Sequence, residues 1–148
     1  MKNHAHISML SRSNNVGLAR LAAATFASEL DFTLNELEEI KVAVSEAVTN
    51  CIIHAYPLEE GVIEIDLEIA EDQLIIVVED KGVGINDLEA VLQPNYSSKE
   101  EHMGLGLAFI DSFMDRFELN SEPGKGTIVK MYKTPEKLKK RQEGNVLN

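Results

Sequence analysis

The stretch SEAVTNCIIHAY limits the possible folds of this chain more than any other, because it has to supply a buried face and a polar ridge on one helix. Apolar and small residues recur there with the i, i+4, i+7, i+8 spacing of a helix that is buried along one side. They are Ile40, Val44, Ala47, Val48, Cys51, Ile52 and Ala55. Pro57 forbids continuation, so we expect this core helix to end at Tyr56.

Three polar residues lie along the border of the buried stripe. Glu46, Asn50 and His54 step by four, so on a helix a carboxylate, an amide and an imidazole share one ridge. The small side chains of Ala43 and Ala47 beside them leave room for a ligand. Half-exposed polar residues are common at the edge of a packed helix, so the ridge alone does not establish a site.

A turn with two glycines follows an apolar strand run and begins with a carboxylate. In the sequence DKGVG, Asp80 stands at the end of the expected strand, while Gly82 and Gly84 allow a tight turn and the close approach of a flat ring. The Asp80 carboxylate can accept a hydrogen bond from an exocyclic amine. Such turns also close hairpins, so the motif gains weight only from those that accompany it.

A second glycine motif opens the last core helix. Gly104 and Gly106 at a helix start would expose backbone N–H groups and the positive end of the helix dipole, which favours phosphate binding. The spacing is neither a Walker motif nor a Rossmann turn, because G-x-x-x-x-G-K-[ST] is absent and no strand directly precedes the glycines. The preceding segment 93–102 has no apolar period and is expected to be a mobile flap.

The remaining pattern predicts one sheet and the helices that cover it. We expect strands at 4–12, 62–69, 74–78, 117–121 and 127–132, and short helices at 16–30 and 86–92. The helix at 16–30 would bury Leu18, Leu21, Ala22, Thr25, Phe26 and Leu30, with Arg20 on its polar side. The continuous apolar run 74–78 is typical of a strand covered on both faces. Thr33 and Glu36 have the spacing of a capping box.

Size and charge narrow the class of protein. A chain of 148 residues is expected to form one domain that buries roughly two-thirds of its unfolded surface. The formal net charge of −11 argues against nucleic acid as the main partner, because phosphate backbones are held by clustered Lys and Arg. Seven of the 14 basic residues follow Gly124, so the body is strongly acidic. A nucleotide bound there would need a divalent cation and backbone N–H groups to offset repulsion of its phosphates.

The single cysteine and the apolar runs predict a cytoplasmic protein. Cys51 has no partner for an internal disulfide and is expected to be a small core residue in a reducing compartment. The first residues, MKNHAHISML, lack the apolar core of a signal peptide, and the longest apolar runs have the length of strands. No membrane span is therefore expected.

Four motifs follow one another along the chain: Glu46…Asn50, Asp80-x-Gly82-x-Gly84, Gly104-x-Gly106 and Gly126-Thr127. Together they resemble the ATP-binding domain shared by gyrase B, Hsp90, MutL and histidine kinases. The resemblance covers nearly the whole chain up to Tyr132. The segments SEAVTNCIIHAY, DLEAVLQP and FMD are similar to those of small anti-sigma serine kinases of the sporulation type, the anti-sigma F factors, with general-stress anti-sigma kinases as the nearest alternative. The resemblance implies an α/β two-layer sandwich (a Bergerat-type ATP-binding fold) with a mixed, mostly antiparallel sheet covered by helices on one face. The domain would span 1–133 and the charged tail, frayed or a short surface helix, 134–148.

The resemblance also implies an activity. Such a protein binds ATP and Mg²⁺, phosphorylates a serine on a small anti-anti-sigma protein and, as a homodimer, holds a sigma factor inactive. Glu46 would take the proton of the incoming hydroxyl, and Asn50 would bind Mg²⁺ through its amide oxygen. Asp80 would bind the adenine amino group, Gly82 and Gly84 would give room for the ring, and Thr127 would bind adenine through water. Gly104 and Gly106 would bind the phosphates. Arg20 would contact a protein partner.

Two positions depart from the family pattern, and three other functions compete. The sporulation type usually has an arginine shortly before Gly-x-Gly, where this chain has a shorter lid with His102, and Lys81 replaces an acidic or amide residue. His54 is expected to be a structural neighbour of the site and not a catalyst.

A histidine kinase would need a phospho-accepting histidine on a dimerisation helix, and a gyrase-type ATPase would need a transducer domain. A binding module that uses ATP only to set its conformation stays open.

Overall fold

A computed structural model describes the backbone of residues 3–86 and 101–147, and the side chains of 3–86 and 106–141. The elements in chain order are β1 (Asn3–Leu10), α1 (Asn15–Ala27), α2 (Leu34–Asn50), the π-helical turn η1 (Cys51–Ala55), β2 (Val62–Ala70), β3 (Gln73–Asp80), α4 (Glu101–Phe113), β4 (Arg116–Glu122), β5 (Gly126–Lys133) and α5 (Glu136–Leu147). The helix predicted at 86–92 and most of the flap predicted at 93–102 lie outside the described residues.

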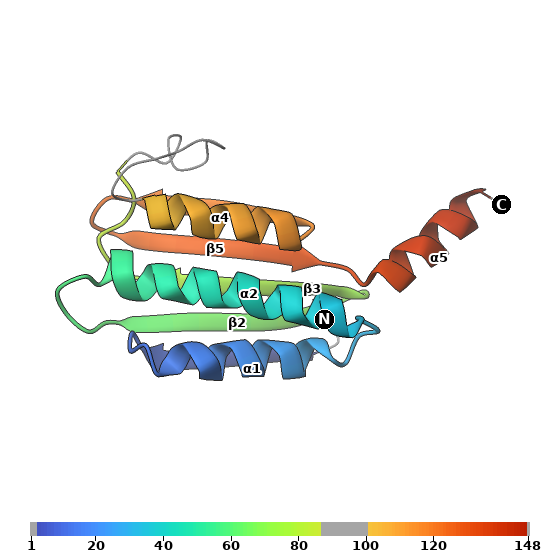
Figure 1. Ribbon diagram of the computed structural model, residues 1–148, viewed down its shortest axis with the longest axis horizontal. Helices are drawn as coiled ribbons and strands as arrows, with labels where there is room; N and C mark the ends of the chain where they lie inside the picture. The colour runs from blue at the N-terminus through green and yellow to red at the C-terminus, as the bar shows by residue number, and fades with distance from the viewer. Residues whose placement is uncertain (1–2, 87–100, 148) are drawn as a thin grey trace.

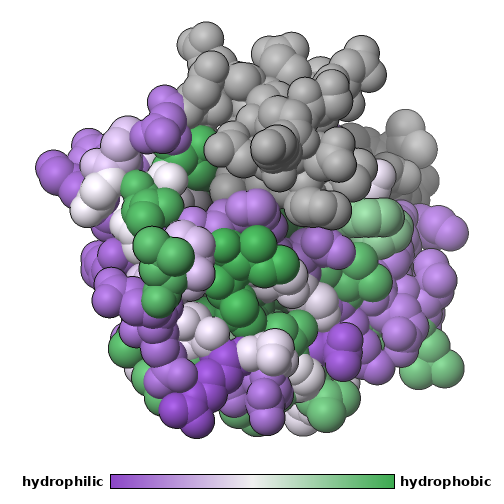
Figure 2. Space-filling model, turned by 60° about the vertical axis from the view of Figure 1, so that its left-hand side comes forward, coloured by the Kyte–Doolittle hydropathy of each residue, from purple (hydrophilic) through white to green (hydrophobic). Residues whose placement is uncertain are grey.

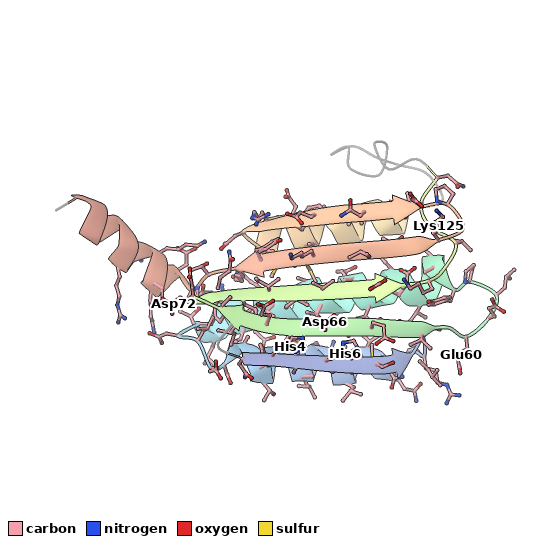
Figure 3. The ribbon with its side chains drawn as sticks, turned by 180° about the vertical axis from the view of Figure 1, so that it is seen from behind. His4, His6, Glu60, Asp66, Asp72 and Lys125 are labelled. Carbon is pink, nitrogen blue, oxygen red and sulfur yellow. The ribbon has the colours of Figure 1, made fainter. Side chains whose placement is uncertain are left out.

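Five strands form one sheet, and the helices lie on one of its faces. The strand order is β1-β2-β3-β5-β4, and every pairing among the described strands is antiparallel. Helices α1, α2 and α4 lie side by side across one face (Figure 1), and the opposite face is open in the view from behind (Figure 3). The predicted α/β two-layer sandwich is confirmed.

The core lies between the sheet and α2. Alternate residues of β2 and β3 point toward the helices and are almost completely buried; they are Ile63, Ile65, Leu67, Ile69, Leu74, Ile76 and Val78. From the helix side, the predicted stripe of Ile40, Val44 and Val48 packs against them with no exposed surface. Removal of these aliphatic side chains from water is the main favourable contribution to the fold.

The prediction that strand 74–78 is covered on both faces is wrong. Ile75 and Val77 alternate with the buried residues and lie half-buried on the open face. Val77 stands opposite Asp66 of β2 and Lys130 of β5 in the sheet register. Long polar side chains of neighbouring strands shield a central strand in part, so a continuous apolar run does not require a second layer of protein.

Helix α1 packs on a different face from the predicted one. Its buried residues are Ala19, Ala23, Ala24 and Ala27, whereas Leu18 and Leu21 are 55% and 60% exposed. The alanines also recur with helical spacing, and their small side chains let α1 approach its neighbours closely. Phe26 and Leu30 of the predicted face do pack against the core, but a pattern weighted by hydrophobicity alone wrongly buries Leu18 and Leu21.

Helix α2 begins where the sequence predicts, but it ends as an α-helix at Asn50, before the predicted end at Tyr56. The amide of Glu36 donates to Thr33 Oγ1 at 3.1 Å, and Glu36 Oε1 accepts from the Thr33 amide at 2.9 Å, so the capping box is confirmed. After Asn50 the helix widens into η1, where the Tyr56 amide donates to the Cys51 carbonyl at 3.0 Å. This i to i−5 bond changes the direction of the side chains that follow Asn50.

The C-terminal segment forms α5, which extends away from the body (Figure 1). Its first turn is attached to the domain, because Glu36 Oε2 accepts from the Glu136 amide at 3.1 Å and Lys139 Nζ lies 2.6 Å from Asp115 Oδ1. Lys137 Nζ lies 3.3 Å from Asp31 Oδ1. In the described part of the chain, no helix has both the length and the apolar character that a membrane crossing requires.

Candidate functional site

Asp80 ends β3 as a buried carboxylate that three donors surround. Its Oδ1 accepts hydrogen bonds from the amides of Gly82 at 3.0 Å and Thr127 at 3.2 Å, and its Oδ2 lies 3.4 Å from Cys51 Sγ. Only 5% of Asp80 is exposed, and this burial raises the pKa of its carboxyl group, while the donors oppose the shift. The structure therefore holds a desolvated acceptor at the end of a core strand.

The glycines after Asp80 are needed for close backbone packing. A Cβ at Gly82 would collide with the carbonyl oxygen of Ala55, and one at Gly84, where φ is +76°, would collide with that of Glu122. The Val83 amide also donates to the Ala55 carbonyl at 3.1 Å. The DKGVG turn is thus fitted between η1 and the β4–β5 turn. Lys81 points away, with Nζ 2.6 Å from Glu79 Oε1.

The Gly126-Thr127 motif on β5 packs against Asp80 as well. Gly126 has φ of +109°, and a Cβ there would collide with the Asp80 carbonyl oxygen. Thr127 Oγ1 lies 2.7 Å from Ser121 Oγ, which also accepts from the Ile85 amide at 2.8 Å. Ser121 therefore connects three segments of the site. No local sequence pattern marks Ser121 as a site residue, because its partner Ile85 is 36 residues away.

A hollow with a mainly apolar lining lies between η1, β3, β5 and α4. It encloses about 430 Å³ of space, including its opening to solvent, and its lining includes Ala47, Asn50, Cys51, His54, Asp80, Gly84, Ile85, Leu107 and Thr127. Four predicted site residues, Asn50, Asp80, Gly84 and Thr127, are thereby brought together. Few polar groups in an apolar hollow are typical of small-molecule sites. Figure 2 shows apolar side chains gathered at this end of the molecule.

Glu46 and Asn50 stand one turn apart on α2, and α4 approaches both of them. A Cβ at Gly106 would lie 3.0 Å from Glu46 Oε2 and 3.3 Å from Asn50 Nδ2, so only glycine gives this approach without displacement. Because α4 begins at Glu101, three residues before the predicted start, the Gly106 N–H lies beyond the four free N–H groups of the first turn. Gly104 lies within that first turn, and its surroundings are outside the described side chains.

The oxygen donors at this end fit a nucleotide-bound Mg²⁺. Among the described residues, no three His, Cys, Asp or Glu side chains converge as a metal-binding cluster. Mg²⁺ in nucleotide sites usually takes one or two protein oxygens and completes its shell with phosphate oxygens and water. The Asn50 amide with the Glu46 carboxylate nearby matches that donor set.

Arg20 does not belong to the hollow. It is exposed on α1, as are Leu18 and Leu21, and α2 separates α1 from α4 (Figure 1). Leu18, Arg20 and Leu21 are thus exposed residues of one helix, two aliphatic and one cationic, and we refer to them together as the α1 surface. Such a surface can contact a protein partner, and none of its three residues lines the hollow.

Comparisons with known proteins agree with this architecture. Residues 9–133 match the histidine kinase-like ATPase domain family. The chain is 46% identical over 133 residues to the anti-sigma F factor of Caldanaerobacter subterraneus subsp. tengcongensis, which covers 88% of this chain and 93% of that relative. It is 44% identical over 133 residues to the anti-sigma F factor of Clostridium kluyveri, with 88% and 94% covered.

Solved structures share the fold at lower identity. The RsbU and RsbW domains of a Mycobacterium tuberculosis protein match with a TM-score of 0.65 and 19% identity, over 90% of this chain and 32% of that one. The histidine kinase domain of a blue-light activated kinase from Erythrobacter litoralis matches with a TM-score of 0.59 and 22% identity, over 86% of this chain and 62% of that one. This chain thus spans less than two-thirds of either solved chain, and the likeness is one of fold.

Proposed function

The chain belongs to the anti-sigma F factors of the histidine kinase-like ATPase domain family, and we propose that it sequesters a sporulation-type sigma factor and phosphorylates a serine on an anti-anti-sigma protein. The observation that carries the proposal is the hollow that has Asp80 and Thr127 at one side and Asn50 at the other, with Glu46 one helical turn further along α2. This arrangement offers separate places for a base, for phosphates and for an incoming hydroxyl group.

In the proposed complex the nucleotide base lies against Asp80. The carboxylate accepts a hydrogen bond from the exocyclic amino group, Gly84 leaves room for the ring, and Thr127 binds the base through a water molecule. Burial strengthens such a hydrogen bond, because water competes poorly for a carboxylate that is 5% exposed. The base end therefore supplies binding energy and selects adenine.

The phosphates extend toward α2 and the start of α4. Asn50 would hold Mg²⁺ through its amide oxygen, and the bound ion would supply neutralisation of phosphate charge that a chain of net charge −11 lacks. Gly106 allows α4 to approach Asn50 and Glu46 closely, and the first turn of α4 offers free N–H groups to the phosphates.

Glu46 is the proposed general base. Its carboxylate takes the proton of the serine hydroxyl as the serine oxygen bonds to the γ-phosphorus and the bond to the ADP oxygen breaks. Phosphoserine and ADP leave, and the proton passes from Glu46 to solvent. Its position one turn from Asn50 on a rigid helix would keep the base at a constant distance from the phosphate end.

The α1 surface is the proposed contact for protein partners. Arg20 supplies a cation on a strongly acidic protein, and Leu18 and Leu21 supply apolar area beside it. We propose that the sigma factor and the anti-anti-sigma protein both use it, and that the working form is a cytoplasmic homodimer with no direct contact to nucleic acid or membrane.

Phosphate transfer from radiolabelled ATP to a candidate anti-anti-sigma protein tests the proposal. We expect Glu46→Gln to lower the transfer rate by about 10²- to 10⁴-fold while it preserves nucleotide binding and sigma-factor capture. Glu38→Gln is the matched control, because Glu38 is an exposed carboxylate on the same helix that pairs with Lys41. Transfer at the unmutated rate by Glu46→Gln would remove the carboxylate from the chemistry. Absence of transfer by the unmutated chain, with ATP-dependent sigma capture, would favour a nucleotide-gated binding module.

A further inference from the structure

The two oxygens of the Asp80 carboxylate have different surroundings. Oδ1 accepts from two backbone amides, those of Gly82 and Thr127, which occupy the two acceptor positions of one carboxylate oxygen. Among the described residues, Oδ2 has one hydrogen-bond partner, the Cys51 thiol, whose Sγ lies 3.4 Å away. Oδ2 therefore keeps one acceptor position for a ligand, and Oδ1 keeps none.

The Cys51 thiol can act only as a donor at this place. Burial, followed by the negative charge of Asp80, raises the pKa of the Cys51 thiol well above its ordinary value, so the sulfur keeps its proton. Sγ also lies 3.4 Å from the Ala47 carbonyl oxygen, one turn earlier. One S–H group is thus shared between a helix carbonyl and the carboxylate, and it is 4% exposed in the wall of the hollow.

We propose that Cys51 is a positioning residue for base recognition: its thiol holds the Asp80 carboxylate so that Oδ2 offers its remaining acceptor position to the exocyclic amino group of a nucleotide base. This inference rests on the proposed nucleotide site. It adds which oxygen of Asp80 receives the base and which side chain holds that oxygen. Without the thiol, Oδ2 has no donor among the described residues until the ligand arrives, and the carboxylate loses one of three fixed contacts.

Infrared spectroscopy of the full chain observes the inferred contact directly. Cys51 is the only cysteine, so the S–H stretching band reports this thiol alone, and Cys51→Ala identifies the band by removing it. We expect Asp80→Asn to move the band toward the frequency of a weaker hydrogen bond, because the charged acceptor is lost. Saturating ADP should also move the band of the unmutated chain, because the amino group then shares Oδ2. A band that neither change moves would show that the thiol donates only to Ala47.

Affinity measurements by calorimetry test whether the contact serves base recognition. We expect Cys51→Ala to weaken ADP binding about three- to tenfold, because one hydrogen bond from a weak donor is lost, and to change binding of the ADP analogue that lacks the 6-amino group by less than about twofold. Val44→Ala is the matched control, because Val44 is fully buried on α2 and does not line the hollow. It should change the affinities for the two ligands equally.

The outcomes separate this inference from the function on which it rests. An equal loss for ADP and the analogue in Cys51→Ala would give Cys51 a merely structural role and overturn this inference alone. An unmutated chain that binds the analogue as tightly as ADP would overturn the proposed base recognition by Asp80, and this inference with it.

Discussion

Two aspartates on neighbouring strands, Asp66 on β2 and Asp80 on β3, show how the two faces of the sheet differ. Asp66 lies on the open face, where hydrogen bonds from His6 Nδ1 at 2.8 Å and His4 Nε2 at 3.2 Å lower the pKa of its carboxyl group (Figure 3). Asp80 lies on the covered face, where burial raises its pKa. The same side chain is a solvated charge on one face and a desolvated acceptor on the other, so the helices that cover the sheet create the candidate site.

The largest expected effect comes from disturbing the covered face at Gly126. We expect Gly126→Ala to lower the free energy of unfolding by roughly 3 kcal/mol, because a Cβ collides with the Asp80 carbonyl and the left-handed φ of +109° becomes strained. Chemical denaturation measures it. Gly124→Ala is the control: its φ is +78°, but a Cβ there meets nothing within 4 Å, so the loss should be about 1 kcal/mol. Equal losses would show that the collision is relieved at no cost.

A second experiment compares the two aspartates directly. We expect Asp80→Asn to weaken ATP and ADP equally, by about 1.5 to 3 kcal/mol, because the lost contact is to the base and involves a charged acceptor. Asp66→Asn should leave both affinities unchanged, since Asp66 faces the other side of the sheet. Calorimetry with both nucleotides measures this. Binding of GTP as tightly as ATP by the unmutated chain would contradict the assignment of Asp80.

A third prediction concerns the phosphate side of the covered face. Asn50→Ala should remove the gain in ATP affinity that Mg²⁺ gives, on the order of tenfold, and leave binding in the presence of a chelator unchanged. The reason is that, among the described residues, Asn50 supplies the only side-chain amide oxygen in the lining of the hollow. Titrations with and without Mg²⁺ give the two affinities. A full Mg²⁺ effect in the variant would exclude Asn50 as a ligand.

The smallest effect is expected on the open face, at His6. Hydrogen bonds to Asp66 and then Glu64 raise the pKa of His6 in the folded protein. The stability that His6 contributes is therefore complete below its unfolded pKa of about 6.5 and is lost as pH rises through the raised folded value. Thermal melts over this range should show a slight fall for the unmutated chain that His6→Gln abolishes. A fall that persists in His6→Gln would have another source.

Much of the fold and part of the site could be predicted from short patterns. The stripe from Ile40 to Ala55, the capping box at Thr33 and the strands expected at 62–69 and 127–132 correspond to observed elements. Asn50, Asp80, Gly84 and Thr127 come from segments far apart in sequence, and the structure brings them to one hollow. These motifs could be found because a tight turn requires glycine and because nucleotide binding requires particular polar side chains, so the residue types themselves mark the positions.

What could not be predicted depends on partners that no short pattern contains. The alanine face of α1 was missed because shape complementarity with α2, and not hydrophobicity, chose it. The bond between the Cys51 thiol and Asp80 joins residues 29 apart, and Ser121 reaches Ile85 across 36. The π-helical turn η1, which contains His54, also has no counterpart in the predicted regular helix.

The sequence by itself determined most of the elements and the residue types available for a nucleotide site, because periodicity and turn chemistry act over a few residues. Only the tertiary structure decided which oxygen of Asp80 stays available, how closely Gly106 brings α4 to Glu46 and Asn50, and which side of α1 remains exposed. These depend on desolvation and on contacts across the sandwich, and both arise only when distant segments pack together.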